Sequence, residues 1–158
     1  MTSRLSNSTL PSLLILLCLL AACSPDAAPV PGAGFEVGKS TFAVYCASCH
    51  QLNGTGSEGR VPPLDGSAWI TGPEERLVRI VLHGLRGSIE VRGQIYNLEM
   101  LGFGQILSDA QIAGVLSYVR ERFGGGARSI DSATVAAVRA GTRDRLVYWT
   151  VAELLEIR

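Results

Sequence analysis

Two cysteines and a histidine, Cys46, Cys49 and His50, form the segment Cys-Ala-Ser-Cys-His and carry the clearest chemical signal in the chain. The two thiols lie on adjacent turns, so both can reach one flat ligand. The histidine that follows directly offers an imidazole to a metal at the centre of that ligand. This C-x-x-C-H spacing is typical of c-type haem attachment, with two thioethers to the porphyrin and an axial imidazole on the iron. The sequence therefore predicts one covalently bound haem c.

A C-x-x-C pair could instead be a redox dithiol or half of a zinc site. A zinc site would need two more Cys or His ligands, and the chain has only Cys18, Cys23 and His83 left. These two cysteines lie in the N-terminal apolar stretch, where they cannot complete the site. A thioredoxin-like dithiol would need a βαβ context, and no strong strand pattern surrounds the motif. Haem attachment is favoured over both alternatives.

Residues 1–22 have the pattern of an export signal. Arg4 supplies a small positive charge, and residues 13–20 form an apolar run that is short for a transmembrane helix. The run ends in Leu-Ala-Ala-Cys, which resembles the lipobox of bacterial lipoproteins. The resemblance implies cleavage before Cys23 and a membrane anchor of several acyl chains on that residue. An ordinary secretory signal, which would leave a free periplasmic protein, is the alternative.

Residues 23–34 are rich in Pro, Ala and Gly and are expected to form a semi-extended tether. Export implies an oxidising compartment, but the lipid and the haem would occupy every cysteine of the mature chain. The chain has 14 basic and 14 acidic residues and lacks the basic stripe that nucleic-acid binding requires. Nucleic acid is therefore excluded as a partner.

Three segments after the tether have helical patterns. Residues 38–47 predict a first helix, and residues 73–82 predict a second helix that begins at a proline. Ser108 and Gln111 have the spacing of a capping box that opens a third helix. Apolar residues then recur every three or four positions, until the glycines at 124–126 end the helix.

With these helices around the haem motif, residues 35–124 resemble the class I monohaem c-type cytochromes. The resemblance implies an all-α, cytochrome c-like fold in which the first and last helices cross. Gly38 and Phe42 match the Gly-x-x-x-Phe pattern before the motif. Val115 and Tyr118 match the aliphatic and aromatic pair on the last helix. A glycine at the crossing would allow close approach of the two backbones.

The expected organisation is a signal peptide (1–22), a tether (23–34), a cytochrome c domain (35–126) and a helical C-terminal extension (127–158). Short helical patterns in the extension flank Tyr148 and Trp149. We expect the extension to fold back on the domain and bury Trp149, because Val135, Val138 and Leu154 offer apolar anchors. Docking of a partner protein is the alternative role.

A haem iron with two axial ligands needs a second donor besides His50. Met100 is the only methionine after the signal, and its segment resembles the family's Met-x-x-Phe-Gly loop, whose glycines would let it approach the porphyrin. His83 is the alternative ligand, although a histidine at a helix C-terminus commonly interacts with the helix dipole. Pro62 matches the family's Pro-x-Leu segment, whose proline carbonyl accepts the ring N–H of the axial histidine.

Donors to the haem propionates are expected among Trp69, Arg79, Arg92 and Tyr96. The resemblance implies a one-electron carrier and not an enzyme, since two axial ligands leave no open site on the iron. Partners would be membrane respiratory complexes or periplasmic dehydrogenases and reductases. The protein would work on the periplasmic side of a bacterial membrane. The alternatives are a haem subunit of a larger dehydrogenase or reductase complex and, less favoured, a haem peroxidase.

Overall fold

The computed structural model describes residues 33–158. The predicted signal peptide, Cys23 and all but the last two residues of the predicted tether lie outside the described residues. The helices of the described part are α1 (Ala33–Thr41), η1 (Phe42–Cys46), α2 (Ala47–His50), α3 (Ala68–Thr71), α4 (Glu74–His83), α5 (Asp109–Phe123), α6 (Ser132–Gly141) and α7 (Val151–Leu155). The strands are β1 (Leu85–Arg86), β2 (Ile89–Val91), β3 (Gln94–Tyr96) and β4 (Trp149–Thr150).

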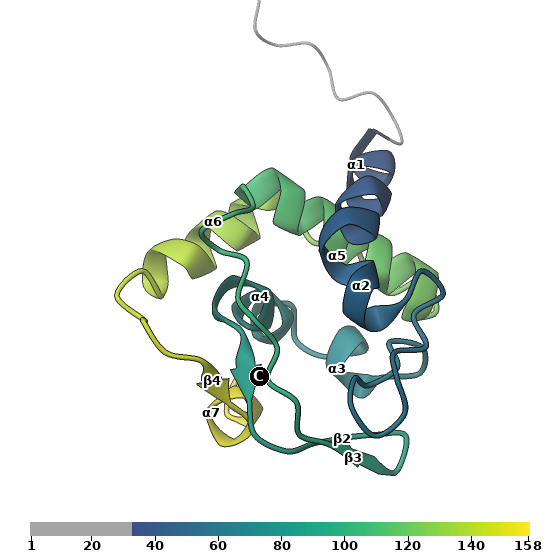
Figure 1. Ribbon diagram of the computed structural model, residues 1–158. Coiled ribbons are helices and arrows are strands. Elements are labelled where there is room, and N and C mark those ends of the chain that lie inside the picture. Colours follow the sequence, from purple (N-terminus) through teal and green to yellow (C-terminus); the bar gives the residue numbers. More distant parts are fainter. Residues whose placement is uncertain (1–32) are drawn as a thin grey trace, which may run out of the picture. The chain divides into compact units, whose positions relative to one another are not determined.

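The strands are short and form two separate two-stranded sheets. β1 pairs in parallel with β4, and β2 pairs with β3 as an antiparallel hairpin. These pairings were not predicted from the sequence. The helices nevertheless supply most of the buried core, so the predicted all-α class is confirmed (Figure 1).

The first helical run is longer than the predicted 38–47 and is not one regular helix. It begins at Ala33 and continues through α1, η1 and α2 to His50. η1 is a π-helical segment, in which the N–H of Ala47 donates to the carbonyl of Phe42, five residues earlier. Such a segment changes the direction in which the following side chains point, and it is often found at functional sites. Here it contains Cys46 and is followed directly by α2, which carries Cys49 and His50.

α1 crosses α5 at two glycines, and aromatic rings surround the crossing. A Cβ on Gly38 would overlap the backbone carbonyl of Gly114, so the predicted close approach is confirmed. Tyr118 packs against Phe35 and Phe42, with ring centroids 5.2 and 5.5 Å apart. The aromatic contacts bury apolar surface on both sides of the crossing.

The predicted ends of the other two helices are close to those observed. Pro73 is the N-cap of α4. At α5 the hydroxyl of Ser108 accepts the N–H of Gln111, and the Gln111 side chain accepts the N–H of Ser108, so the capping box is present. Gly124 ends α5, as the sequence predicts.

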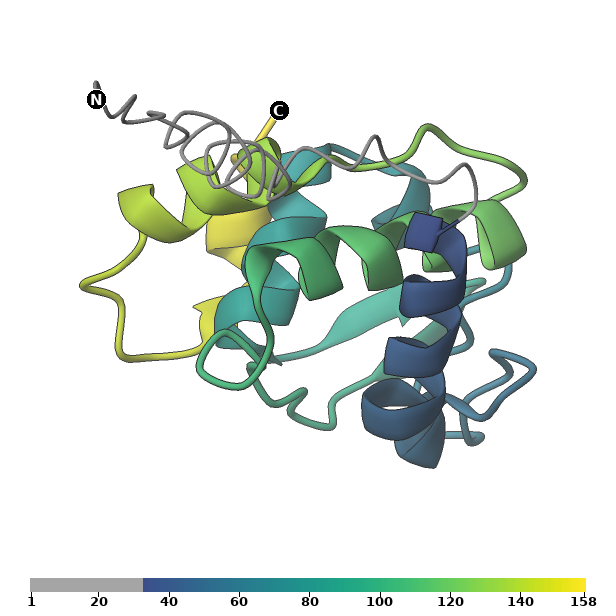
Figure 2. The same cartoon turned by 90° about the horizontal axis from the view of Figure 1, so that it is seen from above.

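The C-terminal extension folds back on the rest of the described chain. Val135 and Val138 of α6 are buried in the main core, and Leu154 of α7 is buried in a second cluster with Leu85. Figures 1 and 2 show α6, β4 and α7 on the side of α4 away from α1 and α2. The expected packing is confirmed, although Trp149 is only partly buried. No helix within residues 33–158 is long and apolar enough to cross a membrane.

Candidate haem site

An apolar pocket lies between the α1–α2 run, α4, α5 and the two-stranded β2–β3 hairpin. Its empty space, including the open mouth, is about 820 Å³. The described residues that line it are Phe42, Cys46, His50, Pro62, Pro63, Leu64, Ser67, Trp69, Ile70, Leu77, Ile80, Val81, Leu85, Ile89, Val91, Met100, Phe103, Leu107, Val115, Leu116 and Val119. Nearly all are hydrocarbon, which suits a large, flat, apolar ligand.

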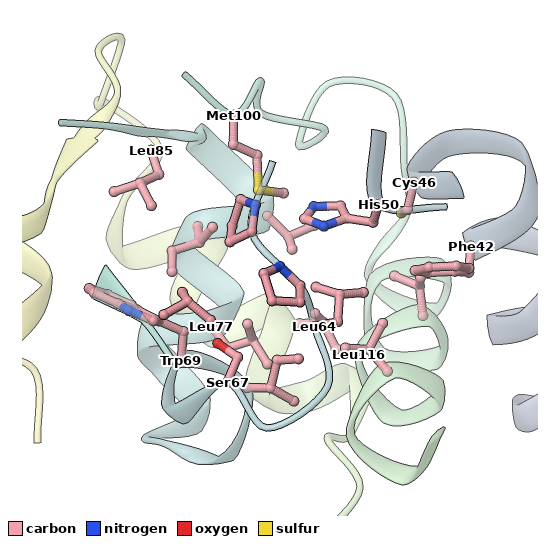
Figure 3. A pocket seen from close by; sticks show the side chains of 18 of the residues that line it. Phe42, Cys46, His50, Leu64, Ser67, Trp69, Leu77, Leu85, Met100 and Leu116 are labelled. Carbon is pink, nitrogen blue, oxygen red and sulfur yellow. The ribbon is translucent and has the colours of Figure 1, made fainter. Parts of the chain in front are cut away.

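Two side chains with metal-binding atoms reach into this pocket from separate segments. Figure 3 shows the imidazole of His50 and the sulfur of Met100 both pointing into it. His50 is the last residue of α2, and Met100 lies in the loop after β3. The expectation that these two residues share one site agrees with their positions.

His50 is half-buried, and its Nδ1 is shielded from solvent with no hydrogen-bond partner among the described residues. Burial lowers the pKa of His50, and the nearby backbone carbonyl of Pro62 opposes that shift. The carbonyl is therefore close enough to act on the ring, while the geometry falls short of a full hydrogen bond. A half-buried, neutral imidazole beside a carbonyl has the character of a metal-ligating histidine.

The two cysteines of the motif are in different surroundings. Cys46 lines the pocket, and burial together with Cys49 raises the pKa of its thiol to about 11. Cys49 is exposed. Cys46 therefore lies in the pocket wall, and the second cysteine of the motif lies at the surface beside it.

Backbone hydrogen bonds fix the position of Met100. Its N–H donates to the carbonyl of Leu85 at 2.9 Å, and its carbonyl accepts the N–H of Leu85 at 3.0 Å. A two-residue strand gives no periodic signal in a sequence, so Leu85 was not predicted as the partner of this loop. The pairing brings the Met100 backbone to one edge of β1.

The glycines after Met100 lie close to α4. A Cβ on Gly102 would overlap the backbone of Leu82 and His83, and one on Gly104 would approach the Leu82 carbonyl. The N–H of Gly104 donates to that carbonyl at 3.0 Å. These glycines therefore let the loop lie against the C-terminal end of α4.

His83 lies outside the described residues that line the pocket. It is the last residue of α4, and its Nε2 is 2.7 Å from the hydroxyl oxygen of Thr142. Its ring packs edge-on against Trp149, with centroids 6.5 Å apart. The geometry favours Met100 over His83 as the residue that faces His50.

Pro62 lies in a loop that backbone hydrogen bonds close. The N–H of Gly56 donates to the carbonyl of His50 at 2.9 Å, and the N–H of Leu64 donates to the carbonyl of Gly54 at 2.7 Å. Gly56 has φ of +66°, and a Cβ there would overlap the carbonyl groups of Val61 and Pro62. The glycine-rich segment, residues 53–60, is therefore folded tightly around the His50 side of the pocket.

Of the four candidate propionate donors, Trp69 lines the pocket, and its Nε1 donates to the carbonyl of Glu90 at 3.4 Å. Arg79 forms an ion pair with Glu75 at 2.8 Å. The others also have local partners: the Tyr96 hydroxyl donates to Gln94, and Arg92 is exposed, 3.9 Å from Asp65. Trp69 is therefore the candidate with the most direct access to the pocket.

The cytochrome c family pattern matches residues 35–122, which is more than half of the chain and includes the pocket and both of its metal-binding side chains. The chain belongs to the cytochrome c family. This cytochrome therefore binds covalently attached haem c, and Cys46 and Cys49 occupy the C-x-x-C-H position. The residues present fit the group, because an apolar cavity receives a half-buried imidazole and a thioether sulfur.

Several curated proteins are similar to this cytochrome. It is 46% identical to cytochrome c-552 of Thermus thermophilus over 83 residues, 50% of this chain and 63% of the relative. It is 36% identical to the Cbb3-type cytochrome c oxidase subunit FixP of Azorhizobium caulinodans over 55% of this chain and 29% of the relative. It is 32% identical to the gluconate 2-dehydrogenase cytochrome c subunit of Pantoea cypripedii, over 66% of this chain and 24% of the relative. The chain thus covers less than two thirds of each relative.

Proposed function

We propose that this cytochrome is a one-electron carrier whose haem iron is held between His50 and Met100, and that a lipid on Cys23 tethers it to the periplasmic side of a bacterial membrane. The observation that carries the proposal is the convergence of these two side chains in one apolar pocket. The family, which consists mainly of electron carriers, supports it.

Bound haem c supplies an iron that takes up and releases one electron. His50 offers its neutral imidazole, since burial lowers its pKa and the neutral form binds metals. The Pro62 carbonyl would orient the ring by accepting its second N–H. Met100 offers a thioether, and a Met/His pair gives a higher reduction potential than two histidines.

Cys46 and Cys49 would hold the group covalently. Each thiol would supply the sulfur of one thioether bond to the porphyrin. Cys46 is in the pocket wall and Cys49 is exposed, which places the attachment site close to the surface. A redox group near the surface suits electron exchange with other proteins.

The chemistry of the pocket wall favours a carrier over a peroxidase. Apart from His50, the described lining contains no Asp, Glu, Lys, Arg or second His that could donate or accept a proton. Peroxide cleavage on a haem needs polar groups in the pocket and access to the iron. Met100 would occupy the position where peroxide must bind.

A redox titration of the soluble Cys23→Ser protein, followed by absorption spectra, tests this function. We expect one reversible one-electron transition and no change in the spectrum of the reduced protein on adding carbon monoxide. Ready binding of carbon monoxide by the unmodified protein would show an open iron site and contradict the carrier assignment.

A haem subunit of a larger oxidoreductase is the second candidate, because some relatives are named as subunits of oxidases and dehydrogenases. The loop beside Met100 exposes Leu98 and Leu101, and exposed apolar side chains beside a redox site suit either a transient or a permanent contact. Co-purification of one catalytic protein from mildly solubilised membranes would favour the subunit. A monomer that exchanges electrons with several respiratory or periplasmic redox proteins would favour the mobile carrier.

A further inference from the structure

The C-terminal segment, residues 132–155, contacts the surroundings of Met100 at two places. The first contact passes through β1. Leu85 pairs with Met100 through one edge of β1, and β4 pairs with the other edge, where the N–H of Trp149 donates to the carbonyl of Gly84 at 3.2 Å. β1 therefore lies between the Met100 loop and the C-terminal segment.

Gly84 shows how closely these three pieces of chain fit. It has φ of +81°, and a Cβ there would overlap both the Met100 carbonyl and the ring of Tyr148. A residue with a side chain would therefore separate the loop from the C-terminal segment. The close fit makes the position of Met100 dependent on the position of β4.

The second contact is made by Arg139 of α6, on the other side of Met100. Its guanidinium group donates to the carbonyl of Leu107 at 2.9 Å and to the carbonyl of Gly104. It also forms an ion pair with Asp109, at the start of α5, at 2.6 Å. The Arg139 side chain thus links the C-terminal end of the Met100 loop, which comprises residues 97–107, to the first turn of α5.

Two apolar side chains of the loop, Phe103 and Leu107, pack against the main core, whereas others are exposed. Leu98, Leu101 and Ile106 are 50%, 64% and 61% exposed. Besides the pairing with Leu85, the described backbone contacts of this loop are to the C-terminal end of α4. Hydrogen bonds to charged groups contribute more than neutral ones, so the bonds of Arg139 are a substantial part of what orders the loop.

The C-terminal segment is itself firmly held. The Arg145 guanidinium lies 3.5 Å from the centre of the Trp149 ring and pairs with Glu153 at 2.9 Å. It also donates to the carbonyl of Tyr148 at 2.9 Å. Arg76 of α4 donates to the carbonyl of Leu154 at 2.9 Å, and Leu154 is fully buried. β4 is therefore a fixed surface against which β1 and the loop can rest.

We propose that the C-terminal segment positions the Met100 loop, and that Arg139 and Arg145 thereby determine how firmly Met100 stays on the haem iron. The inference rests on the proposed axial role of Met100. Arg139 and Arg145 act as positioning residues, since neither lines the pocket among the described residues. A loosened loop would leave the iron position free for a larger fraction of the time.

The test measures the apparent affinity of the ferric holoprotein for imidazole, which must displace Met100 to bind the iron. Arg139→Gln removes the charge. Arg143→Gln is the matched control, because Arg143 is 79% exposed and, within residues 33–158, pairs only with its neighbour Asp144. We expect Arg139→Gln to bind imidazole roughly tenfold more tightly than the unmodified protein. Arg139→Lys should restore part of the difference, and Arg143→Gln should match the unmodified protein.

Arg145→Gln tests the contact through β4 independently. This variant should also bind imidazole more tightly than the unmodified protein. Circular dichroism distinguishes positioning from general unfolding, because the helical signal of each variant should remain. If Arg139→Gln and Arg145→Gln both bind imidazole as Arg143→Gln does, the inference is overturned. Failure of the proposed function itself looks different, since Met100→Ala would then bind imidazole no more tightly than the unmodified protein.

Discussion

Gly38 of α1 and Gly114 of α5 touch backbone to backbone where the two helices cross. A Cβ on Gly38 would overlap the carbonyl group of Gly114 and the Cβ of Tyr118. Neither neighbour is the free end of a flexible side chain, so the overlap could be relieved only by moving the helices apart. Phe42, one turn after Gly38, lines the haem pocket, and the crossing therefore also sets the shape of the pocket wall.

Replacing Gly38 with alanine should lower the free energy of unfolding by about 2–3 kcal/mol, because the added methyl group overpacks the crossing. Denaturant titration of the holoprotein, followed by circular dichroism, measures the change. Gly34→Ala is the control within α1, since a Cβ there meets no atom within 4 Å. Equal midpoints for the two variants would contradict the crossing as described.

Ser108→Ala should cost about 1 kcal/mol of stability, because it removes the hydroxyl that caps the first turn of α5. Ser108→Thr keeps a capping oxygen and should stay close to the unmodified protein. Thermal unfolding curves of the three proteins provide the comparison. A Thr variant as unstable as the Ala variant would show that the hydroxyl is not what stabilises the helix.

The unfolding free energy should decrease as pH falls below about 6.5, the ordinary pKa of histidine. Burial lowers the pKa of His83 in the folded protein, and the guanidinium of Arg145 lowers it further. The unfolded chain therefore binds more protons than the folded one in this range, so acid favours unfolding. Denaturant titrations at a series of pH values should show a smaller dependence in His83→Gln; an unchanged dependence would assign the effect to another group.

Cys23→Ser should release the exported protein from membranes, because it removes the proposed lipid attachment point. Fractionation of cells, followed by immunoblotting of membrane and soluble periplasmic fractions, measures this. Cys18→Ser is the control within the signal peptide and should leave the protein on the membrane. If both variants fractionate as the unmodified protein does, Cys23 is not the anchor.

The helices could be predicted where the sequence carries local signals. Ser108 and Gln111 specify the start of α5, and Gly124 specifies its end, because capping depends on neighbouring residues only. The first helical run was predicted too short. A π-helical segment such as Phe42–Cys46 has no recognisable periodicity, so neither it nor the continuation to His50 could be read from the pattern.

The candidate haem-binding residues could be predicted from the sequence, but the contacts around them could not. Cys46, Cys49 and His50 form a contiguous motif, and Met100 was the remaining methionine in a recognisable loop. The backbone partner of Met100 is Leu85, and the nearby contacts of Trp149 with Gly84 and of Arg139 with Leu107 also come from residues distant in sequence. Two-residue strands and single arginine side chains leave no periodic trace, so only the folded structure reveals them.

The absorption spectrum of the ferric holoprotein reports whether the Met100 sulfur binds the iron. Ligation of ferric haem iron by a thioether sulfur gives a weak far-red charge-transfer band. We expect this band in the unmodified protein, its loss in Met100→Ala and its retention in His83→Gln. Absence of the band from the unmodified protein, or its survival in Met100→Ala, would contradict the assignment of His50 and Met100 as the two axial ligands.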